Sequence, residues 1–228
     1  MRLLPILLIV LYAVAMWLFS AWRLRQELNA NSTPLNHPRL AAALDRLGRA
    51  MGIGPVRAHV YEIEPVNGLA APDGRVFLTR GFLNQFDSGR VTEAELASVI
   101  AHELGHVTHG HARRRMMDFA GQNLVRTVLA ATLGRFIPFI GPWIAIVAAS
   151  ALAAGMSRRD EYEADAFAAA LMVKAGFGTG PQKALLSRLD KLTGATGRPV
   201  AWLASHPPIP RRIAAIEALE RRWQVSAG

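Results

Sequence analysis

The sequence predicts an α+β fold that is mostly α-helical, with a small antiparallel sheet and a transmembrane helix ahead of the folded part. Three observations predict this class of fold. They are an uncharged apolar run at the N-terminus, short β-type runs between residues 56 and 79, and apolar residues at helical spacing over most of the rest. We therefore expect an anchor over residues 1–25, a linker over 26–38 and one domain over 39–228.

The composition limits the class of protein. Hydrophobic residues make up 51% of the 228 residues and charged residues only 19%, which excludes a largely disordered chain. Cysteine is absent, and this excludes both a disulfide scaffold and a cysteine-ligated metal site. The net charge of +9 is compatible with nucleic acid, with an anionic lipid surface or with no specific partner. We expect no nucleic acid partner, because Arg113–Arg115 lacks interleaved aromatic residues and no recognition module is evident.

Residues Leu3–Trp22 form the predicted anchor. They carry no charge, are flanked by Arg2 and Arg23, and as a helix span about 30 Å, the thickness of the bilayer hydrocarbon. The alternative is a cleaved signal peptide, for which Ala13–Ala15 supplies the small-residue pattern, but the apolar run continues beyond that point. The side of the membrane stays open. The arginines after the run favour a cytoplasmic domain, whereas anchors with a short basic start usually export the domain on their C-terminal side.

The elements after the anchor are short and separated by turn signals. Residues 26–38 are polar without a packing period, which is typical of a linker. Residues Arg39–Met51 have helical spacing and end at the turn Gly52–Pro55. Three β-type runs come next, and the turn Pro72-Asp73-Gly74 joins the last two as in a hairpin: Arg57–Ile63, Val66–Ala70 and Arg75–Thr79. From Thr92 the pattern is helical, with breaks at glycine and proline.

The helix that starts at Thr92 carries the chemistry. Thr92 and Glu95 have the spacing of a capping box. His102 and His106 are four residues apart, so both imidazoles leave the same helix face and can bind one metal ion. Glu103 is rotated by about 100° from His102, so it lies beside the metal and can act as general base on a water molecule. This is the H-E-x-x-H arrangement of zinc peptidases.

A catalytic zinc ion needs a third protein ligand, which we expect from another helix. His109 lies in the same row as the first two histidines, and three ligands along one straight helix cannot surround a metal tetrahedrally. Glu161 and Asp165 are four residues apart on a later helix, and the small Ala164 and Ala168 allow close helix approach. One carboxylate can bind the metal while the other orients a ligand imidazole.

A second apolar run, Phe136–Met156, is also long enough to cross a membrane. A single crossing would place His106 and Glu161 on opposite sides of the bilayer, although both must reach one metal ion. We therefore expect a buried core helix, or a re-entrant or interfacial segment, rather than a second span.

The motifs together resemble the HtpX-like zinc metallopeptidases, a family that includes the Oma-type and CAAX-prenyl-protease-type enzymes. That family has H-E-[LF]-[GA]-H, then S-R-x-x-E-x-x-A-D, then a late H-P followed by R-I. The matching segments are His102–His106, Ser157–Asp165 and His206–Ile213. A fourth segment, Val66–Pro72, resembles the family's N-A-F-x-x-P strand, with Gly68 in place of the usual alanine. The resemblance runs over nearly the whole predicted domain and implies a zincin-like helical metallopeptidase fold.

Residue by residue, the resemblance implies one Zn²⁺ per chain and a set of site residues. The implied zinc ligands are His102, His106 and Glu161, the implied base is Glu103, and the implied support of a ligand histidine is Asp165. The edge that pairs with an extended substrate is matched by Asn67, Gly68, Leu69 and Ala70. His206 matches a histidine that in some members blocks the metal site or stabilises the oxyanion, although loop histidines are as often without such a role. Arg212 can pair with a substrate carboxylate or with the surroundings of Glu103, or be a solvated helix start.

The sequence therefore predicts a membrane-anchored zinc metalloendopeptidase that acts on unfolded or membrane proteins, as in protein quality control, with membrane lipids as further partners. Zinc would acidify a water molecule, and Glu103 would take its proton and pass it to the leaving amine. The alternative is a catalytically silent relative that acts as a binding or chaperone-like module, but such a module does not need Glu103. A prenyl-protein protease fits less well, because that branch is expected to have several membrane spans.

Overall fold

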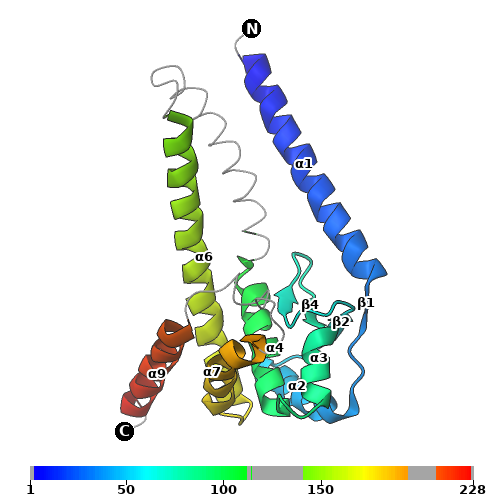
Figure 1. Ribbon diagram of the computed structural model, residues 1–228, viewed down its shortest axis with the longest axis vertical. Coiled ribbons are helices and arrows are strands. Elements are labelled where there is room, and N and C mark those ends of the chain that lie inside the picture. The colour runs from blue at the N-terminus through cyan, green and yellow to red at the C-terminus, as the bar shows by residue number, and fades with distance from the viewer. Residues whose placement is uncertain (1–2, 112–113, 115–140, 195–208, 227–228) are drawn as a thin grey trace.

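The structure is a computed structural model that describes residues 3–111, 114, 141–194 and 209–226 (Figure 1). These residues are mostly helical with one small sheet, as expected for the predicted α+β class. The helices are α1 Leu3–Ala30, α2 Pro38–Met51, α3 Arg80–Asp87, α4 Glu93–Thr108, α6 Gly141–Lys174, α7 Gly180–Gly194 and α9 Ile209–Ser226. The strands are β1 Ser32–Pro34, β2 Ala58–Tyr61, β3 Gly68–Ala70 and β4 Val76–Thr79.

The sheet is mixed, which corrects the expectation of an antiparallel one. Its strand order is β1-β2-β4-β3. β3 and β4 form the expected antiparallel hairpin, with Gly74 at a φ of 89° in the turn. β2 and β4, however, are parallel, and Ala58 lies opposite Val76. The cause is the path of the chain between Tyr61 and Gly68, because β3 takes the outer position and β4 turns back into the gap between β2 and β3.

Two segments contain structure that the sequence patterns did not predict. Within the expected linker, Ser32–Pro34 pairs with β2 as a short antiparallel strand. This strand needs no hydrophobic period, because pairing at a sheet edge uses backbone groups alone. The residues Arg80–Asp87 form α3, whose first turn is capped by Thr79. The Thr79 hydroxyl accepts a hydrogen bond from the amide of Phe82.

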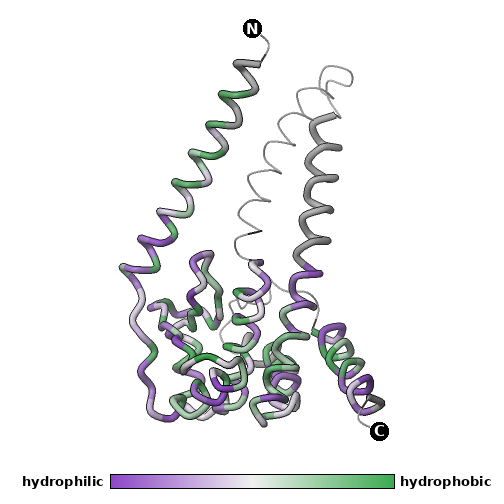
Figure 2. The backbone as a smooth tube through the Cα atoms, turned by 180° about the vertical axis from the view of Figure 1, so that it is seen from behind, coloured by the Kyte–Doolittle hydropathy of each residue, from purple (hydrophilic) through white to green (hydrophobic). Residues whose placement is uncertain are grey.

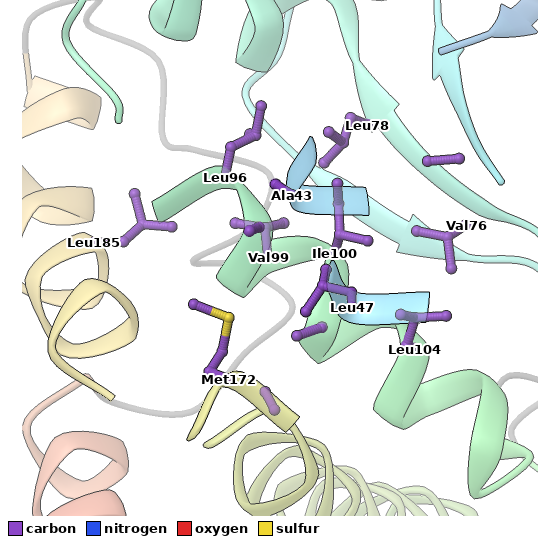
Figure 3. Close-up of a cluster of buried hydrophobic side chains, with 14 of the residues drawn as sticks. Ala43, Leu47, Val76, Leu78, Leu96, Val99, Ile100, Leu104, Met172 and Leu185 are labelled. Carbon is purple, nitrogen blue, oxygen red and sulfur yellow. The ribbon is translucent and has the colours of Figure 1, made fainter. Parts of the chain in front are cut away.

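Helix α4 lies at the centre of the core. Figure 3 shows its apolar side chains among those of α2, β4, α6 and α7. The residues labelled there are Ala43, Leu47, Val76, Leu78, Leu96, Val99, Ile100, Leu104, Met172 and Leu185. Every residue of α4 from Glu95 to His106 is buried, as expected for a helix that is surrounded on all sides. The polar side chains of its second half are therefore buried as well.

Helix α1 projects from the body of the molecule (Figure 1). Near its C-terminal end Leu28 is buried with Ala71 and Phe77, whereas most of the described large apolar side chains before it are exposed. Figure 2 shows hydrophobic residues along the part of α1 that lies farthest from the body. The large exposed side chains are Leu7, Leu8, Leu11, Tyr12, Val14, Met16, Leu18, Phe19, Trp22 and Leu24. In the described part of the chain, no helix combines the length and the hydropathy needed to span a membrane.

The second apolar run, Phe136–Met156, lies outside the described residues as far as residue 140. From Gly141 onwards its backbone is helical and forms the first half of α6.

Candidate metal centre

The site begins with the capping box that starts α4. The hydroxyl of Thr92 accepts a hydrogen bond from the Glu95 amide at 3.2 Å, and the Glu95 carboxylate accepts one from the Thr92 amide at 2.8 Å. Arg188 of α7 pairs with the same carboxylate at 3.2 Å. These contacts fix where α4 starts and how it is rotated about its axis, and therefore which face presents the two histidines.

Helix α6 crosses α4 at two small residues. A Cβ atom added to Gly105 would lie only 3.0 Å from the Cα and the carbonyl oxygen of Ala164, so the two backbones are in close contact. Glu161 and Asp165 lie on either side of Ala164 in the sequence. The close crossing brings both carboxylates up to the histidines of α4.

Three ligand atoms meet at this crossing. The Nε2 atoms of His102 and His106 are 3.1 Å apart, and the carboxylate oxygens of Glu161 lie 3.3 Å and 3.4 Å from them. Ligands bound at about 2.0–2.1 Å to a tetrahedral zinc ion are about 3.3–3.4 Å apart. The 3.3 Å distance joins His102 to Oε2 of Glu161 and the 3.4 Å distance joins His106 to Oε1, so each contact has the length of a tetrahedral edge. The set of two imidazoles and one carboxylate can therefore hold a metal ion.

Asp165 occupies the other side of His102. Its Oδ1 lies 3.0 Å from His102 Nδ1, so this carboxylate holds the ring with Nε2 directed at the other two ligand atoms. Helical spacing alone left open which of Glu161 and Asp165 would face the metal, and the family resemblance implied Glu161. The structure places Glu161 with the two Nε2 atoms and Asp165 behind His102.

Arg212 of α9 reaches the same carboxylate. Its guanidinium donates two hydrogen bonds of 2.6 Å to Asp165, and the side chain is only 1% exposed. This placement corrects the expectation of a solvated helix start, because Arg212 is buried against Asp165. A buried guanidinium that holds Asp165 in a two-pronged ion pair acts on the histidine behind the metal position.

Burial and the neighbouring charges act in opposite directions on the pKa values of His102 and Asp165. Burial alone would lower the pKa of His102, but hydrogen bonds with Asp165 and Glu161 raise it to about 9. Burial alone would raise the pKa of Asp165, but the charge and hydrogen bonds of Arg212, with a smaller contribution from His102, lower it to about 2. In the metal-free chain the pair is therefore charged at neutral pH.

Glu103 lies under strand β3. It is 2% exposed, and a Cβ atom added to Gly68 would come within 3.0 Å of its Oε1. β3 is the outer strand of the described sheet, with β4 on one side only. The segment Asn67–Ala70 therefore places a sheet edge directly beside Glu103, and the absence of a side chain at Gly68 permits this closeness.

Two other histidines of the prediction have different outcomes. His206 lies outside the described residues. His109 follows the last turn of α4, is exposed, and stacks on His111 with ring centroids 5.2 Å apart. It is not among the three residues that meet at the crossing, as the straight-helix geometry required. The sequence patterns did not single out His111, which is fully buried next to His106.

Comparisons with known proteins find a peptidase family and several metalloproteases with similar sequences. The family model described as Peptidase family M48 matches residues 34–220. Metalloprotease YcaL of Escherichia coli is 31% identical over 174 residues, which cover 76% of this chain and 66% of YcaL. A protease HtpX homolog of Acidiphilium cryptum is 30% identical over 214 residues, which cover 78% of this chain and 72% of the homolog. The mitochondrial metalloendopeptidase OMA1 of Schizosaccharomyces pombe is 28% identical over 192 residues, or 81% of this chain and 54% of OMA1. The chain thus spans about half to three quarters of the length of these relatives.

Proposed function

The chain belongs to peptidase family M48, and from this membership and the geometry of the site we propose that it is a membrane-anchored zinc metalloendopeptidase. We propose unfolded or membrane proteins as its substrates and one Zn²⁺ ion per chain as its cofactor. The observation that carries the proposal is the meeting of His102, His106 and Glu161, whose ligand atoms lie within 4.8 Å of one another, with Glu103 next to His102 on α4.

The ligand set favours zinc over the hard cations. Magnesium and calcium prefer sites built from oxygen ligands, whereas two imidazoles and one carboxylate are a common set in catalytic zinc sites. With three protein ligands, a tetrahedral ion keeps one position for water or substrate. All three residues are at most 5% exposed, so the site lies in surroundings where charges interact strongly.

Each residue of the site has a separate role in the proposed peptide hydrolysis. When bound, zinc supplies a Lewis acid that polarises the scissile carbonyl and makes water more acidic. Glu103 takes a proton from the attacking water and delivers it to the leaving amine. Asp165 and Arg212 keep the His102 ring in its ligand orientation. The outer edge of β3 offers backbone donors and acceptors to an extended substrate, which orients the scissile bond beside Glu103.

The N-terminal segment supports the membrane anchor. The uncharged run Leu3–Trp22 lies within α1, and most of its described large apolar side chains are about half exposed or more, Trp17 being partly buried. Bilayer hydrocarbon would cover these side chains. The net charge of +9 favours anionic lipid head groups as neighbours of the anchor. In this arrangement the protease acts at a membrane surface, where damaged membrane proteins are available as substrates.

The test compares the purified full chain in detergent with the variant Glu103→Gln on an unfolded protein substrate. We expect Glu103→Gln to bind zinc with unchanged stoichiometry and to lose turnover by about 10²–10⁴-fold, because only the base is removed. A zinc chelator abolishes cleavage by the parent chain, and added zinc restores it. The matched control is Glu93→Gln on the first turn of the same helix, which keeps full activity. Equal cleavage by Glu103→Gln and the parent would refute the enzymatic proposal and leave the binding-module alternative.

A further inference from the structure

His111 is a buried polar residue that the proposed reaction does not use. It follows the end of α4, where Gly110 at a φ of 66° turns the chain back toward the helix. The side chain is 0% exposed, although it belongs to neither the three ligand residues nor the Asp165–Arg212 pair. A buried imidazole needs partners for both nitrogens, and these partners lie on α4 and α6.

One of these partners is a ligand histidine. His106 directs Nε2 at the ligand cluster, which leaves Nδ1 on the other side of its ring. This Nδ1 lies 2.9 Å from the Nδ1 of His111. At that distance one nitrogen donates a hydrogen bond and the other accepts it. A histidine that binds metal through Nε2 carries its proton on Nδ1, so His106 is the donor and His111 the acceptor.

The protons of His111 then follow from this assignment. Since its Nδ1 accepts, a neutral His111 carries its proton on Nε2. That atom lies 3.2 Å from Oε2 of Glu163 and 3.7 Å from Oδ1 of Asp160, both on α6. A single assignment of protons therefore satisfies the chain of contacts from the ligand nitrogen of His106 through His111 to Glu163.

We propose that His111 is a positioning residue for the metal ligand His106, which it holds in the correct tautomer and rotation with the help of Glu163. The proposal rests on the proposed zinc site. In this arrangement both ligand histidines have their second nitrogen occupied, His102 by a carboxylate directly and His106 through another imidazole. Such partners of ligand histidines typically contribute about 10–100-fold to metal affinity.

His111 and Glu163 could alternatively belong to a second metal site. The ligand atoms of His109, His111 and Glu163 lie within 4.8 Å of one another and could hold a second metal ion. Two arginines oppose it, because Arg159 bonds the other oxygen of Glu163 at 2.9 Å and Arg114 lies 3.3 Å from the adjacent Asp160. A metal on His111 Nε2 would also displace the proton that this atom donates to Glu163. The contacts therefore favour the positioning role.

The test measures zinc affinity by competition with a chromophoric chelator, using the full chain in detergent. His111→Leu removes the acceptor, and we expect its zinc dissociation constant to rise about 10–100-fold. His111→Asn has nearly the same shape as His111→Leu, but its amide oxygen restores an acceptor near the position of Nδ1. Its zinc affinity therefore stays within about threefold of the parent. The exposed neighbour provides the control, because His109→Ala leaves the affinity unchanged. Cobalt(II) bound in place of zinc should show an altered visible absorption spectrum in His111→Leu alone.

A substitution at Glu163 tests the same proposal if His111→Leu does not fold. The Glu163 side chain is 32% exposed, and we expect Glu163→Leu to weaken zinc binding by about tenfold, the lower end of the range for such partners. Arg159→Leu removes the neighbouring ion pair only and leaves zinc affinity unchanged. An unchanged affinity in both His111→Leu and Glu163→Leu would overturn the positioning role, as would a second zinc equivalent that His109→Ala removes. A parent chain that binds no zinc would instead overturn the metal site itself.

Discussion

The buried ion pair between Arg212 and Asp165 provides the sharpest test of how the site is built. The substitution Arg212→Met keeps the length and apolar stem of the side chain and removes its charge. Asp165 is then left as a carboxylate with 1% exposure and without its two hydrogen bonds of 2.6 Å from the guanidinium. Breaking a buried pair in this way typically costs about 3–5 kcal/mol.

The pKa of Asp165 gives a second measure of the same interaction. Its surroundings lower this pKa from 3.8 to about 2 although burial opposes the change. The lowering corresponds to about 2.5 kcal/mol in favour of the charged carboxylate. Both routes give a loss of about 3 kcal/mol, which for a chain of this size lowers the melting temperature by about 6–12 °C.

The assay is thermal unfolding of the metal-free chain in detergent, followed by circular dichroism. Arg211→Met is the matched control, because Arg211 is the exposed neighbour on the same helix turn and its loss should leave the melting temperature unchanged. In Arg212→Met/Asp165→Asn the carboxylate charge that lost its guanidinium is absent, so at least half of the lost stability returns. If Arg212→Met has unchanged stability and a raised KM, Arg212 does not stabilise Asp165 and instead binds the substrate.

Two further predictions concern the packing of α6 and of α9. Ala164→Leu adds bulk at the close contact with Gly105, so it should lower the free energy of unfolding by about 1–3 kcal/mol and weaken zinc binding at least tenfold. The control Ala170→Leu, at an exposed position on the same helix, should change neither quantity. A parent-like zinc affinity in Ala164→Leu would contradict the close crossing. The hydrogen bond from Lys183 lowers the pKa of Glu220 from its usual 4.5. The ion pair that links α7 and α9 is therefore fully present above pH 4.5 and is lost as the pH falls through the lowered pKa of Glu220. Amide exchange in α9 should accelerate in the parent as the pH falls through the lowered pKa of Glu220 and should change less in Lys183→Met. Equal acceleration in both would rule the link out.

Local spacing predicted the elements whose geometry is confined to one helix. The capping box of Thr92 and the common face of His102 and His106 follow from helical periodicity alone, and the structure has both. The hairpin of β3 and β4 was predictable for the same reason, because its turn residues are adjacent in sequence. The parallel pairing of β2 with β4 was not, because it depends on which side of the hairpin the preceding strand reaches.

Contacts between distant segments account for the features that local spacing left open. Glu161 and Asp165 share one helix face, and only the crossing with α4 places one among the ligand atoms and the other behind His102. Arg212 lies 47 residues after Asp165, and no spacing rule connects them. His111 follows α4 in sequence, but its return toward His106 depends on the turn at Gly110, whose positive φ no hydrophobic pattern announces.

The balance of buried charge explains why this crossing suits a divalent ion. Glu103, Glu161 and Asp165 are each at most 2% exposed, and Arg212 contributes one buried positive charge against these three carboxylates. Buried charges are costly unless they are compensated, so the site favours two further positive charges. A zinc ion supplies both with neutral imidazoles as ligands, whereas the metal-free chain takes up a proton, in keeping with the pKa of about 9 at His102. Zinc binding should therefore release this proton, and the affinity for zinc should rise with pH up to about 9.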